Sequence, residues 1–119
     1  MTRERFSYYV RRAVSRLPPR LRERIENVAF VIETEPSDGR RSLLGLYHGI
    51  PLTRRSGGYS AVLPDKITLF QKNIEEVAGP GPEERVSQLI EEVVRHEIAH
   101  YFGMDERRVR RWEKHRKSN

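Results

Sequence analysis

Residues 86–106 of this chain read VSQLIEEVVRHEIAHYFGMDE. The apolar positions in this stretch recur three and four residues apart, at Val86, Leu89, Ile90 and Val93. This spacing predicts an amphipathic helix, and the same steps continue onto the polar side chains within residues 96–100. The polar side chains are therefore expected on the buried face. Pro82 and the two acids after it favour the start of this helix, and Gly103 favours its end.

On the N-terminal side of this helix, the sequence predicts helical segments followed by short strands. Apolar residues at helical spacing predict a first helix over about 3–16, and Pro19 or Arg20 begins a short helical turn that ends near Asn27. Segments rich in β-branched and aromatic residues predict strands at 28–34, 43–47, 59–63 and 66–71. A turn sequence at 36–39 favours a hairpin between the first two strands, and the short connections favour a largely antiparallel sheet.

On the C-terminal side, a basic helix is predicted from Asp105 to about Lys117, with Asp105 as its N-cap. The fold class is therefore α+β. It has N-terminal helices, a short, mostly antiparallel sheet, a long helix that carries the histidines, and a C-terminal basic helix. A chain of 119 residues has room for one core, so residues 1–119 are expected to form a single domain.

The chain contains no cysteine, which excludes disulfides, thiolate metal sites and a cysteine nucleophile. This composition favours a reducing compartment, and we expect a cytoplasmic protein. Arginines interrupt the apolar residues near the N-terminus, so neither a secretory signal nor a membrane span is predicted there.

The net charge is +6, which favours polyanionic partners such as nucleic acid. However, 19 of the 23 basic residues are arginine, they are scattered among 17 acids, and amide residues are few. A thermophilic or GC-rich source explains such a composition equally well. Nucleic acid is therefore the second candidate partner, after a peptide or protein substrate, and the sequence does not indicate an oligomeric state.

The motif His96-Glu97-Ile98-Ala99-His100 carries the chemistry. Two imidazoles four residues apart lie above one another on one helix face, so both can bind a single tetrahedral ion. Zn²⁺ would lower the pKa of a bound water to about 7, and the carboxylate of Glu97 would accept its proton as the water attacks a carbonyl. The motif therefore predicts a zinc-dependent hydrolase with Glu97 as its catalytic base.

The extended pattern His96-Glu97-x-x-His100-x-x-Gly103-x-x-Glu106 resembles the zinc signatures of the metzincins and Asp-zincins. Residues 44–56 and 62–67 also resemble stretches of the minimal bacterial zincin-like metallopeptidases. The resemblance covers most of residues 5–112. It implies a small zincin core whose strand near 67–71 lies beside the active-site helix, where an extended substrate would pair.

The third metal ligand has two adjacent candidates. Asp-zincins have aspartate where this chain has Glu106, and Asp105 precedes it. We select Glu106, with His96 and His100, because its offset from Gly103 matches the related signatures and its longer side chain can span the gap. Asp105 is then available to cap the last helix.

Two other functions remain open from the sequence. The first is a binding or regulatory module that keeps a zincin site with little proteolysis and contacts nucleic acid through its basic surface. The second is a metal-dependent nuclease similar to the rRNA-maturation endoribonucleases, although these lack a glutamate at the position of Glu97. Tyr101 or a loop arginine is a candidate for stabilising the oxyanion. The physiological substrate is not indicated.

Overall fold

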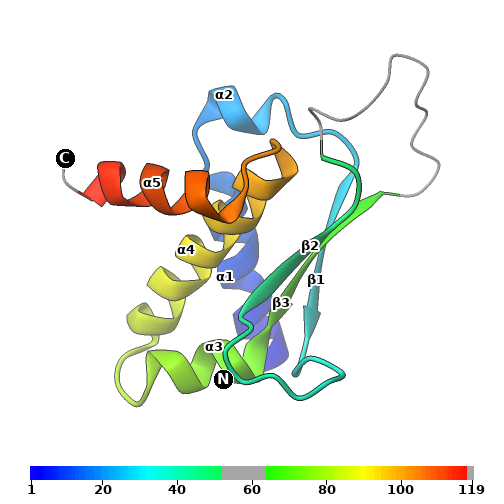
Figure 1. Ribbon diagram of the computed structural model, residues 1–119. Coiled ribbons are helices and arrows are strands. Elements are labelled where there is room, and N and C mark those ends of the chain that lie inside the picture. The colour runs from blue at the N-terminus through cyan, green and yellow to red at the C-terminus, as the bar shows by residue number, and fades with distance from the viewer. Residues whose placement is uncertain (52–63, 118–119) are drawn as a thin grey trace.

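The computed structural model describes residues 1–51 and 64–117. Within these residues, five helices and three strands follow one another in an α+β fold, which confirms the predicted class (Figure 1). In chain order they are α1 (Arg3–Ser15), α2 (Pro19–Arg22), β1 (Val28–Glu33), β2 (Gly45–His48), β3 (Asp65–Phe70), α3 (Gln71–Ala78), α4 (Glu83–Tyr101) and α5 (Glu106–Lys117). In the described part of the chain, no helix is long and apolar enough to cross a membrane.

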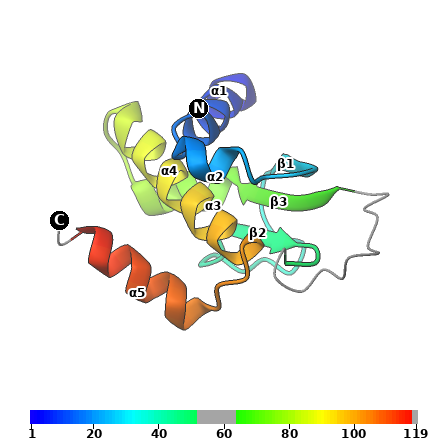
Figure 2. The ribbon, with the colours of Figure 1, turned by 90° about the horizontal axis from the view of Figure 1, so that it is seen from above.

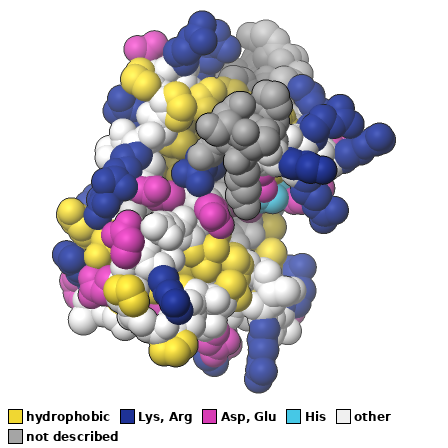
Figure 3. All heavy atoms as spheres, turned by 90° about the vertical axis from the view of Figure 1, so that its left-hand side faces the viewer, with side chains coloured by type: hydrophobic (Ala, Val, Ile, Leu, Met, Phe, Trp, Pro, Cys, Tyr) yellow, Lys and Arg dark blue, Asp and Glu magenta, His cyan; other side chains and the backbone are white. Residues whose placement is uncertain are grey.

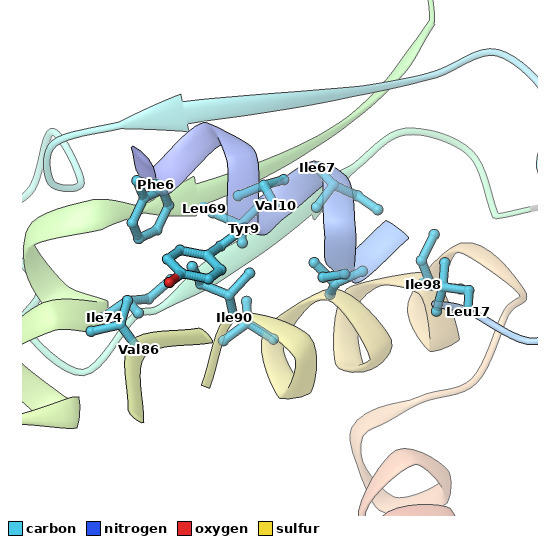
Figure 4. Close-up of a cluster of buried hydrophobic side chains, with 13 residues drawn as sticks. Phe6, Tyr9, Val10, Leu17, Ile67, Leu69, Ile74, Val86, Ile90 and Ile98 are labelled. Atoms are coloured by element: carbon cyan, nitrogen blue, oxygen red, sulfur yellow. The ribbon is translucent and has the colours of Figure 1, made fainter. Parts of the chain in front are cut away.

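The core forms where α1 and α4 pack against one side of the sheet (Figures 1 and 2). Phe6 and Val10 of α1, Ile67 and Leu69 of β3, and Ile90 of α4 are buried there, as Figure 4 shows. These positions follow the helical and strand periods in the sequence, so the apolar faces of all three elements meet. Burial of these side chains holds α4, and with it residues 96–100, against the sheet.

The order of strands differs from the predicted hairpin. The sheet is mixed, in the order β1-β3-β2, with β1 parallel and β2 antiparallel to β3. Strand β3 therefore lies between β1 and β2, and the connection from β1 to β2 crosses over to the other side of it. The predicted antiparallel pairing holds only for β2 and β3. Neighbours in sequence usually pair, but a connection as long as residues 34–44 permits another order. The strand predicted at 59–63 lies outside the described residues.

Helix α3 was not predicted. It begins directly after β3, and its Ile74 is fully buried in the core. The side-chain amide of Asn73 donates hydrogen bonds to the carbonyls of Arg40 and Leu43, both at 2.8 Å. These bonds fix the segment that enters β2. Helix α3 therefore places β2 beside α4.

Candidate metal centre

Helix α4 places His96 and His100 on one face near its C-terminal end. Their ring centroids are 5.1 Å apart, as expected for side chains one helical turn apart. Both rings direct Nε2 toward the same carboxylate oxygen, Oε1 of Glu106, at 3.0 Å from His96 and 2.8 Å from His100. Ligand atoms of these three residues all lie within 4.8 Å of one another. The structure thus brings together the three residues that the sequence selected as metal ligands.

A turn between α4 and α5 brings Glu106 to this position. Gly103 adopts a φ of 89°, which favours glycine, and its N–H donates to the carbonyl of His100. The Oδ1 atom of Asp105 accepts a hydrogen bond from the backbone N–H of Arg108 at 2.9 Å, which confirms the predicted N-cap. With Asp105 held in this way, Glu106 in the first turn of α5 faces the two imidazoles.

The hydrogen-bond partners of the imidazoles indicate that a cation fits this site. His100 Nδ1 lies 2.9 Å from the carbonyl of Met104, and His96 Nδ1 lies 3.1 Å from Oε1 of Glu113. A carbonyl or carboxylate oxygen accepts but does not donate, and a neutral imidazole has only one N–H to give. If Nδ1 donates in each ring, both Nε2 lone pairs and the Glu106 oxygen point to one place. Two imidazoles and a carboxylate form a donor set that suits Zn²⁺.

The carboxylates of the centre also affect its titration. Burial lowers the pKa of His96, but the hydrogen bonds that its ring donates to Glu106 and Glu113 outweigh burial, so the net shift is upward. For Glu106, burial raises the pKa, and the hydrogen bonds to His96 and His100 outweigh it and lower the pKa. In the metal-free centre, His96 and Glu106 therefore both favour their charged forms.

Glu97 lies beside the histidines and is only 7% exposed. Its Oε1 atom accepts a hydrogen bond from the backbone N–H of Tyr47 in β2 at 2.9 Å. Burial raises the pKa of Glu97, while the charges of His96 and His100 act in the opposite direction. A carboxylate with a raised pKa is better matched to accepting a proton near neutral pH.

Strand β2 approaches α4 closely enough to make this contact because residue 45 is glycine. A Cβ atom at Gly45 would lie 2.6 Å from Cγ1 of Val93, closer than packed carbon atoms allow. Strand β2 is therefore the strand next to the centre. The resemblance had implied that the strand near 67–71 lies beside the active-site helix and pairs with the substrate. Strand β3 does pack against α4, but it lies in the middle of the sheet, paired with β1 and β2, so it is not an edge strand for a substrate.

Two hollows flank the centre along β2. The first, about 340 Å³, lies toward the start of α4, and its apolar lining consists of Leu43, Leu44, Leu89 and Val93. The second, about 370 Å³, lies toward Gly103 and Pro51. Glu97 and Glu106 line both hollows. The candidate site therefore lies between two open spaces.

The candidates for stabilising an oxyanion have different outcomes. Tyr101 is fully buried, and its hydroxyl accepts a hydrogen bond from the backbone N–H of Glu26 at 3.1 Å. This places its hydroxyl against the segment between α2 and β1, and we withdraw it as a candidate. The loop arginines Arg54 and Arg55 lie outside the described residues.

Sequence reasoning did not predict the roles of Tyr47, Met104 and Glu113 at the centre, because their contacts with Glu97, His100 and His96 depend on how distant segments pack.

The two adjacent acids give a test of the ligand set. Loss of an outer partner of a metal ligand typically weakens metal affinity by about 10- to 100-fold. Because Glu106 is itself a proposed ligand, we expect Glu106→Ala to weaken zinc affinity by more than about 100-fold. Asp105→Ala should instead cost about 1 kcal/mol of stability through the lost cap. Zinc titration and thermal unfolding of both variants measure these effects. Loss of zinc from Asp105→Ala alone would contradict the assignment.

A family model described as zincin-like metallopeptidase matches residues 25–115. The matched range covers most of the chain, so the chain belongs to this family. No curated protein matches it.

Proposed function

We propose that this zincin-like metallopeptidase is an active zinc peptidase, with His96, His100 and Glu106 as metal ligands and Glu97 as general base. The observation that carries the proposal is the convergence of three potential ligand atoms, from His96, His100 and Glu106, on one place beside the buried carboxylate of Glu97. The His₂Glu set leaves a fourth position of a tetrahedral ion open for chemistry.

A bound zinc ion would supply Lewis-acid chemistry, polarising a peptide carbonyl and acidifying a water molecule. The remaining steps belong to the residues of this chain. Glu97 accepts a proton through its carboxylate, and its burial favours the protonated form that follows. The Tyr47 N–H fixes one oxygen of this carboxylate, which leaves the other for the reacting proton. The proton can then pass from Glu97 to the leaving amine.

The substrate that we propose is an extended peptide lying along β2. Among the described residues, β2 pairs only with β3, so it is an edge strand beside the centre. Edge strands bind extended peptides through main-chain hydrogen bonds. The hollows on both sides of Glu97 and Glu106 would receive the side chains that flank the scissile bond.

A second candidate function is a metal-holding module that binds nucleic acid. Its support is the outer face of α5, where basic side chains are exposed at Arg107, Arg108, Arg110, Arg111 and Lys114. Lys and Arg side chains also gather on the right of the view in Figure 3. A basic helix face is common on solvated surfaces, whereas the buried Glu97 beside the histidines has a specific chemical use. We therefore rank the peptidase first.

We also propose that the chain is a single domain acting in the cytoplasm. The lack of cysteine fits a reducing compartment. The core that joins α1 to α4 and β3 fits one domain.

One preparation can test these functions together. We expect one zinc per chain by elemental analysis and cleavage of casein, an unstructured protein, that stops after chelation and returns with added zinc. The same preparation should leave RNA intact. Stoichiometric zinc without casein cleavage would move the binding module ahead, and zinc-dependent RNA cleavage would replace the peptidase with a nuclease.

A further inference from the structure

A second acid of α5, Glu113, contacts the centre from outside the set of candidate ligands. Its Oε1 atom lies 3.1 Å from His96 Nδ1, the ring nitrogen that faces away from Glu106. The two side chains are partly buried, with 31% of Glu113 and 26% of His96 exposed. This contact joins helix α5 to the first histidine of the motif.

The period of α5 makes this contact possible. Glu113 follows Glu106 by seven residues, or two helical turns, so both acids lie on the same face. Val109 lies between them on this face and is fully buried. Arg107, Arg108 and Arg111 are exposed. The inner face of α5 therefore presents an acid, an apolar anchor and a second acid to α4.

We propose that Glu113 is a positioning residue, which holds His96 with Nδ1 protonated and its Nε2 lone pair directed at the metal position. The inference rests on the proposed zinc centre. In an imidazole, the hydrogen bond at one nitrogen sets which nitrogen carries the proton. Without an acceptor at Nδ1, the ring can rotate or carry its proton on Nε2, and either change removes a lone pair from the centre.

His100 provides an internal comparison. Its Nδ1 lies 2.9 Å from the carbonyl of Met104, in the turn that directly follows α4. The local chain therefore holds His100, whereas His96 depends on a side chain 17 residues away. Loss of Glu113 should consequently affect His96 and leave His100 in place.

The test compares Glu113→Ala and Glu113→Gln with Glu92→Ala as control. Glu92 is an exposed acid that lines the same hollow, and among the described residues no hydrogen bond joins it to His96. We expect Glu113→Ala to weaken zinc affinity by about 10- to 100-fold. Glu113→Gln should lose less, because the amide oxygen still accepts from Nδ1–H. The control should stay within about twofold, as expected for a solvated charge.

A spectroscopic measurement separates positioning from a merely structural role. In metal-free protein that carries Glu106→Ala, which removes the competing acceptor at Nε2, ¹⁵N NMR of the neutral imidazoles should show His96 with its proton on Nδ1. Glu113→Ala should lose this preference for His96 alone.

Either of two results would overturn the inference. These are an unchanged His96 tautomer with unchanged zinc affinity, or equal losses of affinity in Glu113→Ala and the Glu92 control. A wild-type chain that binds no zinc would instead refute the proposed function, while the metal-free spectrum would still test the role of Glu113.

Discussion

Glu97→Gln should retain one zinc per chain and lower the turnover of peptides by about 10²- to 10⁴-fold, the usual contribution of a general base. The amide preserves the shape of the side chain, and its oxygen can still accept the Tyr47 N–H. It cannot take a proton from water. The proposed role of Glu97 therefore predicts loss of chemistry with the metal retained.

Stability gives an independent readout of the same change. Glu97 is buried, and burial disfavours its charged form, so the neutral amide should fold at least as stably as the wild type. Equal kcat values in Glu97→Gln and wild type, measured with zinc content and Tm, would remove the hydrolase proposal. Glu84→Gln, exposed in the first turn of the same helix and outside both hollows, is the matched control and should leave the zinc content and kcat unchanged.

The second large effect is expected when both imidazoles are removed. The variant with His96→Ala and His100→Ala should fall from about one zinc per chain to almost none, because only the carboxylate of Glu106 remains of the three proposed ligands. Elemental analysis after dialysis and competition with a chelator measure this loss. The helix should persist, because alanine has the highest helix propensity.

His48→Ala is the control for this variant. His48 is exposed at the end of β2, paired across the sheet with Lys66, and it lies outside the group of side chains that could hold a metal. Removing it should leave the zinc content unchanged. Full zinc occupancy in the double variant would place the metal elsewhere in the chain.

Local patterns in the sequence predicted the helices well. The expected first helix at 3–16 agrees with α1, and the helix expected between Pro82 and Gly103 agrees with α4. The last helix begins beside its predicted cap, Asp105. Helical periods and caps involve residues only a few positions apart, so they can be read from a short window.

The strand order could not be read in the same way. The sequence indicated the strands at β1, β2 and β3, but the predicted hairpin is absent because β3 pairs with both of the other strands. Pairing depends on which distant segments bury their faces together. Helix α3 was missed because it is short and starts immediately after a strand, without a side-chain cap.

By itself, the sequence determined that His96, Glu97 and His100 share one helical stretch and that Gly103 ends it within reach of Glu106. These relations are fixed by the helical repeat and by a glycine conformation, both local in the chain. Only the tertiary structure decided what surrounds that stretch. The bond from Tyr47 to Glu97 spans 50 residues, and the contact of Glu113 with His96 requires α5 to pack on α4. Such contacts arise when burial brings separate elements together, and no spacing along the chain encodes them.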